Sequence, residues 1–166
     1  MADGLTMRRA APADAALIAD LIRELADYER LSHEAEADAA MIAVALFGPA
    51  PKVFCEIAQW GGAPAGFALW FNNFSTFSGR HGIYLEDLYV RGAFRGRGIG
   101  KALLARLAGL CVENGWSRLQ WSVLDWNAPA IGFYKKLGAD VLPDWRLCRV
   151  GGAGLKALAG ACRRDL

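Results

Sequence analysis

The pattern of strands and helices changes near residue 90, and this change limits the folds that the chain can adopt. Before it, predicted strands over Lys52 to Gln59 and Gly66 to Phe71 flank the turn sequence Gly-Gly-Ala-Pro, which is typical of an antiparallel hairpin. After a further strand over Ile83 to Val90, strands and helices alternate, and such crossovers join parallel neighbours. We therefore predict an α/β fold with a mixed, mostly antiparallel central sheet and helices on both faces.

Hydrophobic periodicity predicts the remaining elements. In the first half we expect a strand over Leu5 to Arg8, an amphipathic helix after Pro12 and a second helix over Glu34 to Phe47. The second half should contain a helix ending at Asn114, a strand over Arg118 to Leu124, a helix over Pro129 to Leu137, a strand over Trp145 to Val150 and a weak terminal helix within Gly151 to Leu166.

Composition excludes several classes of protein. The 166 residues with 54% hydrophobic side chains favour one compact domain over residues 1–166. The apolar runs fall far short of a bilayer span and Met1 to Ala11 lacks a signal-peptide core, so we expect a cytoplasmic protein without a membrane partner. A net charge of +2 argues against nucleic acid as a partner. Four cysteines without a C-x-x-C pair, and two histidines, predict no metal site.

A glycine-rich, basic segment over Gly92 to Gly100 follows one predicted strand and begins a helix. Its glycines at 96, 98 and 100 match neither a dinucleotide fingerprint nor a P-loop. Glycines at a helix amino end nevertheless let backbone N–H groups approach an anion, and five basic residues without an acid lie between Arg91 and Arg106. These features favour a pyrophosphate site, with a solvated basic turn as the alternative.

Three separated blocks and this loop carry a resemblance to a known family. The blocks are LIRELADYE at 21–29, YLEDLYV at 84–90 and VLDWN at 123–127, followed by Pro129 and the run Phe-Tyr-Lys. Their order resembles the GNAT family of acetyl-CoA-dependent N-acetyltransferases, and within it the spermidine/spermine and thialysine acetyltransferase branch. The resemblance covers roughly residues 5–150.

The resemblance implies that acetyl-CoA enters between two splayed central strands. It also implies a homodimer. The positions that it assigns to acetyl-CoA are Leu88, Tyr89, Val90, Arg95, Gly96, Arg97, Gly98, Ile99, Gly100, Lys101, Asn127, Pro129 and Tyr134.

Acetyl transfer needs a neutral amine, and an alkyl amine of pKa near 10.4 is neutral in about 1 molecule in 2,500 at pH 7. A carboxylate can take the proton. Strand alternation puts Tyr84, Glu86 and Leu88 on one face and Leu85, Asp87 and Tyr89 on the other, so one of the two adjacent acids should face the cofactor. From strand position alone, both acids can equally be ordinary ion-pair partners. The resemblance selects Glu86 as general base and Tyr134 as general acid.

The resemblance also implies an amine site formed by Tyr28, Glu29, Glu86 and Asp87, with Phe77 and Trp145 lining the cleft. Ser75 and Phe77 depart from the polyamine enzymes, which favours a diamine or a lysine-like amino acid over a long polyamine. A protein or peptide amine is an alternative acceptor. A non-catalytic acyl-CoA-binding module is a second alternative.

Overall fold

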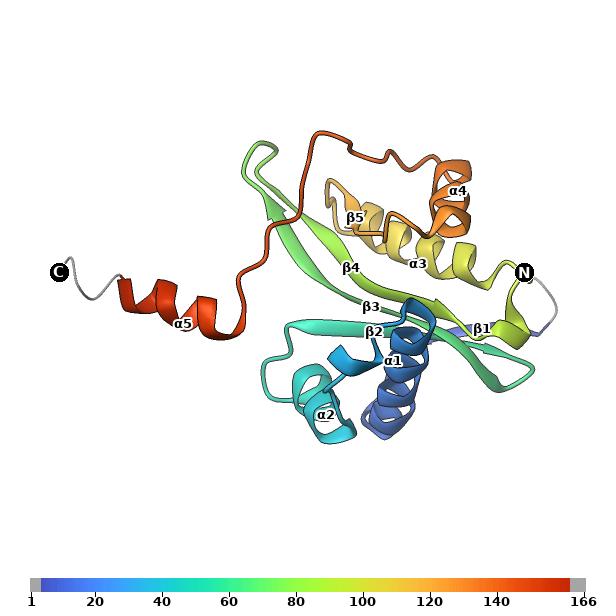
Figure 1. Cartoon of the computed structure of the whole chain (residues 1–166). Coiled ribbons are helices and arrows are strands. Elements are labelled where there is room, and N and C mark those ends of the chain that lie inside the picture. Colours follow the sequence, from blue (N-terminus) through green and yellow to red (C-terminus); the bar gives the residue numbers. More distant parts are fainter. Residues whose placement is uncertain (1–3, 162–166) are drawn as a thin grey trace. The chain divides into compact units, whose positions relative to one another are not determined.

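The computed structural model describes residues 4–161, which form two compact units, one up to Leu124 and one from Asp125 onward. The first unit contains a five-stranded sheet in the order β1-β2-β3-β4-β5 (Figure 1). Neighbouring strands are antiparallel except for β4 and β5, which are parallel. The strands are β1 (Leu5–Arg9), β2 (Val53–Trp60), β3 (Ala63–Ser75), β4 (Arg80–Val90) and β5 (Leu119–Trp121). The predicted mixed, mostly antiparallel sheet is confirmed.

Helices cover both faces of this sheet. On one face lie α1 (Ala15–Glu29) and α2 (Ala39–Phe47), and on the other lies α3 (Ile99–Glu113) (Figure 1). Ile18 and Leu21 of α1 are fully buried together with Ile57 of β2 and Phe67 of β3, so burial of apolar area holds α1 against the sheet. The second helix begins later than predicted, because the Asp38 carboxylate accepts a hydrogen bond from the Met41 N–H and caps it there.

Strand β4 contains a bulge at Glu86. Leu69 of β3 lies opposite Asp87, but the next residue, Trp70, lies opposite Leu85, so Glu86 is an extra residue in β4. Asp87 therefore lies on the α1 face with Leu69, which is part of the core under α1 and α2. Tyr84 lies opposite Phe71, two residues beyond Leu69, and shares this face. The predicted strict alternation, which put Tyr84 and Asp87 on opposite faces, is wrong because the bulge shifts it by one residue.

The second unit contains α4 (Ala128–Lys136) and α5 (Gly152–Ala161). Residues 145–150, predicted as a strand, form no strand here. An extended segment becomes a strand only where a neighbour takes its backbone hydrogen bonds, and within the described part of this unit no segment pairs with it. Among residues 4–161, no helix is long and apolar enough to span a bilayer.

Candidate active site

The two parallel strands separate after a short stretch of pairing. Ile83, Tyr84 and Leu85 of β4 pair with the three residues of β5, and the pairing ends there. From Glu86 to Val90, no described residue pairs with the β5 side of β4. Unpaired backbone N–H and C=O groups on such an edge can pair with an extended ligand. The splayed arrangement expected of the two central strands is therefore present.

Three carboxylates, here called the acid cluster, gather where the strands separate: Glu29, Glu86 and Asp87. Burial raises the pKa of Asp87 to about 7, with further contributions from the charges of Glu86 and Glu29. Burial also raises the pKa of Glu29 at the end of α1. Glu86 itself is exposed. A cation bound beside these carboxylates would relieve the repulsion among them.

The raised pKa of Asp87 predicts a pH-dependent stability. Its pKa is about 7 in the folded chain and about 3.9 in an unfolded one, so the folded chain binds the extra proton between these values. The free energy of unfolding should therefore fall as the pH rises from about 4 to about 7. Asp87→Asn should raise the free energy of unfolding by about 2 kcal/mol at pH 8, a value reduced for the partial exposure of this side chain, and by much less at pH 4. Urea unfolding of both proteins at the two pH values measures this; an equal change at both would contradict it.

The glycine-rich loop has the geometry of an anion site. Gly96 and Gly98 have φ values of 77° and 80°, and a Cβ at either would have no neighbour within 4 Å. The first hydrogen bond of α3 runs from the Ala102 N–H to the Gly98 carbonyl, so the N–H groups of Ile99, Gly100 and Lys101 precede any partner within the helix. Together with the positive end of the helix dipole, these groups fit a diphosphate such as that of acetyl-CoA.

An ion pair that the sequence analysis did not include connects α1 to the end of β4. Arg91 donates to Glu24 through Nε at 3.0 Å and Nη2 at 2.7 Å, and through Nη1 to the Pro64 carbonyl at 3.1 Å. Such a bidentate pair fixes the orientation of the guanidinium relative to the carboxylate as well as the distance between them. It holds α1, which carries Tyr28 and Glu29, beside the start of the loop. Its only sequence signals were that Glu24 lies in the first block and Arg91 opens the basic run.

These features coincide with matches to known proteins. The model of the acetyltransferase (GNAT) family matches residues 18–139. The chain belongs to the GNAT family. It is an acetyl-CoA-dependent N-acetyltransferase, and the family predicted from the sequence is confirmed.

Individual relatives support the same branch of the GNAT family. A thialysine N-epsilon-acetyltransferase of Bos taurus is 37% identical over 165 residues, which cover 93% of this chain and 96% of that protein. An L-ornithine N5-acetyltransferase of Arabidopsis thaliana is 45% identical over 94 residues, covering 57% of this chain and 41% of that one. Among solved structures, an integron cassette protein of V. cholerae superposes with a TM-score of 0.79 at 27% identity, covering 94% of this chain and 98% of that chain.

The arginines assigned to acetyl-CoA by the GNAT resemblance are held by other contacts. Arg95 donates from Nε to the Val90 carbonyl at 2.9 Å, and its guanidinium carbon lies 4.5 Å from the centre of the Tyr28 ring. Arg97 lies 5.0 Å from the centre of the Trp60 ring. Arg95 therefore links the loop to α1, and phosphate binding by either arginine stays a prediction.

The second unit carries four further residues that the GNAT resemblance assigned: Asn127, Pro129, Tyr134 and Trp145. Asn127 caps α4, since its Oδ1 accepts from the Ala130 N–H at 3.2 Å, and Pro129 follows in the first turn. Tyr134 lies in α4 with its ring centre 5.3 Å from that of Phe133. Trp145 is largely exposed. Glu86 belongs to the first unit and Tyr134 to the second, so their joint action as general base and general acid stays a prediction.

Phe77 is 99% exposed in the turn between β3 and β4. The hairpin places it away from the acid cluster, since β4 begins at Arg80 and rises by about 3.3 Å per residue, or about 20 Å, before reaching Glu86. Within one chain, the structure does not bring Phe77 to the acids.

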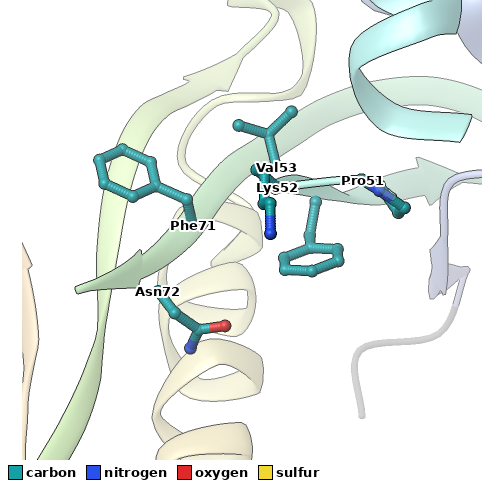
Figure 2. A pocket seen from close by; sticks show the side chains of 6 residues that line it. Pro51, Lys52, Val53, Phe71 and Asn72 are labelled. Carbon is teal, nitrogen blue, oxygen red and sulfur yellow. The ribbon is translucent and has the colours of Figure 1, made fainter. Parts of the chain in front are cut away.

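A hollow of about 550 Å³ lies at the start of β2 and the far part of β3 (Figure 2). Its lining residues are Pro51, Lys52, Val53, Phe54, Phe71 and Asn72. None of the residues assigned to acetyl-CoA or to the amine is among them.

Proposed function

We propose that this GNAT enzyme transfers the acetyl group of acetyl-CoA to a primary amine of a small molecule, either a diamine or a lysine-like amino acid. The observation that carries the proposal is the acid cluster beside the point where β4 leaves β5. A cationic amine would be attracted there before reaction. The relatives named for thialysine and L-ornithine act on amines at the end of amino-acid side chains, which favours this class.

Glu86 would act as the general base. The bulge leaves its side chain exposed next to the unpaired edge of β4, where it can take a proton from the ammonium directly or through one water. Until that proton is transferred, the carboxylates of Glu29 and Asp87 would hold the ammonium group. Bound acetyl-CoA would supply the thioester that the neutral nitrogen attacks. As the C–N bond forms and the C–S bond breaks, the Tyr134 hydroxyl would give a proton to the departing sulfur, and the second proton released by the nitrogen would restore that hydroxyl.

The test is a panel assay of the full chain with acetyl-CoA. Diamines, spermidine, spermine, lysine, thialysine, ornithine and a lysine-containing peptide are each added, and free thiol is followed. We expect amine-dependent thiol release with short diamines or the amino acids, and weaker release with spermine. Release only with peptides would favour a protein acetyltransferase. Acetyl-CoA binding without release on any amine would favour the acyl-CoA-binding module and overturn the proposal.

The glycine-rich loop supplies a prediction about donor affinity. Gly98→Ala should raise the Kd for acetyl-CoA about tenfold, because a Cβ at φ 80° is strained and would crowd the diphosphate. Isothermal titration of acetyl-CoA measures the change. Gly109→Ala in α3 is the matched control, since its Cβ would meet only Glu113 at 3.9 Å and helix propensity favours alanine. Equal affinities in the wild type and Gly98→Ala would remove the loop from the donor site.

We further propose that the enzyme is a homodimer, as the resemblance implies, and that it is cytoplasmic, as its apolar runs and its first eleven residues lead us to expect. Light scattering after size exclusion should report about twice the chain mass of 17.9 kDa. A monomer at micromolar concentration would contradict the dimer.

A further inference from the structure

Two hydroxyl groups bridge β4 and β5 at the point where the strands separate. The Tyr84 hydroxyl and the Ser122 Oγ are 2.7 Å apart. The last paired residues are Leu85 and Trp121, so Glu86 and Ser122 would form the next pair if the strands continued together. The hydroxyl pair therefore lies across the first open position, beside the Glu86 backbone.

The Tyr84 side chain is held from two directions. Its ring centre is 5.2 Å from that of Phe71 on β3, and its hydroxyl reaches Ser122 just beyond β5. It therefore links β3, β4 and the residue that follows β5 on the α1 face, the face on which Asp87 also lies. These two contacts favour one orientation of the ring and of its hydroxyl.

Few backbone hydrogen bonds hold β4 to its neighbouring strands near Glu86. Pairing between β4 and β5 covers three residues of each strand, and the bulge at Glu86 interrupts the ladder on the other side of β4. The hydrogen bond between the Tyr84 and Ser122 hydroxyls is an additional connection between β4 and the chain just after Trp121. Such a bond limits how far the strands part.

We propose that the Tyr84–Ser122 hydrogen bond sets the separation of the two strands at the opening and so positions Glu86 relative to the reacting amine and thioester. Tyr84 and Ser122 are positioning residues in this role, which rests on the proposed function. Loss of either hydroxyl should widen the opening. The acceptor amine would still bind to the acid cluster, but the proton acceptor would be misplaced for the chemical step.

The first measurement is kinetic. Tyr84→Phe and Ser122→Ala should each lower kcat about three- to tenfold with the KM of the amine nearly unchanged, as expected for loss of one hydrogen bond. The double variant should be no slower than either single one, because one bond is lost in all three. Ser122→Thr keeps the hydroxyl, so its kcat should equal that of the wild type. Ser78→Ala, which removes a 3.3 Å contact with Ser117 at the far end of the same strands, is the control. Wild-type kcat in both single variants, or multiplying losses in the double variant, would overturn the proposal.

The second measurement does not depend on catalysis. Amide hydrogen exchange over residues 83–86 and 119–122 should be several-fold faster in Tyr84→Phe and in Ser122→Ala, while peptides from α1 exchange as in the wild type. Unchanged exchange in these segments would overturn the proposal whatever the kinetics. If the wild type releases no thiol with any amine, the proposed function fails, and exchange alone then decides whether the hydroxyl pair holds the strands together.

Discussion

Replacing Glu86 by Gln is expected to lower kcat/KM for the best amine by about 10²- to 10⁴-fold. The amide keeps the size of the side chain but cannot accept the ammonium proton, and general-base catalysis contributes on this scale. The bulge that exposes Glu86 at the unpaired edge of β4 is the structural reason for choosing this acid over Asp87. Initial rates of thiol release over pH 6–10 measure the effect, and the loss should shrink at high pH, where more amine is already neutral.

Binding measurements separate a lost base from a lost fold. Glu86→Gln should bind acetyl-CoA with the wild-type Kd and unfold at the wild-type temperature. Glu113→Gln, an exposed acid at the end of α3, should leave kcat/KM unchanged. Turnover of Glu86→Gln at the wild-type rate would assign the proton transfer to another group.

Arg9→Met is expected to lower the free energy of unfolding by about 3 kcal/mol. Glu56 is 1% exposed, and its carboxylate accepts from Arg9 at 2.9 Å, with Arg106 of α3 farther away at 3.7 Å. Removing Arg9 leaves a buried charge poorly compensated, which costs far more than the loss of an exposed pair. The guanidinium also lies over the rings of Phe54 and Trp70, so that contact is lost as well. Urea unfolding at pH 7 measures the change.

A matched pair on the surface supplies the control. Arg23 contacts Asp20 at 2.6 Å, but both side chains are more than half exposed, so Arg23→Met should cost no more than about 0.5 kcal/mol. The double variant Arg9→Met, Glu56→Leu should recover much of the loss, since no buried charge remains. Equal costs for the two arginine variants would show that burial of Glu56 does not govern this pair.

Local patterns were sufficient to predict most of the elements. The apolar spacing of α1, the turn between β2 and β3, and the glycines around α3 all depend on neighbouring residues, so each was found from the sequence. Errors arose where a distant partner decides the outcome. β5 is shorter than predicted because only three residues meet β4, and residues 145–150 form no strand because no described segment of their unit pairs with them.

The sequence by itself determined the family, the mixed sheet and the glycine-rich loop at the start of α3, because motif order and periodicity are properties of the chain. Only the tertiary structure decided that Tyr84 and Asp87 share a face, that Arg91 holds Glu24, and that Tyr84 meets Ser122 where the strands part. A bulge changes side-chain direction without any mark in the sequence of β4. Contacts between segments distant in sequence likewise form only when packing brings those segments together.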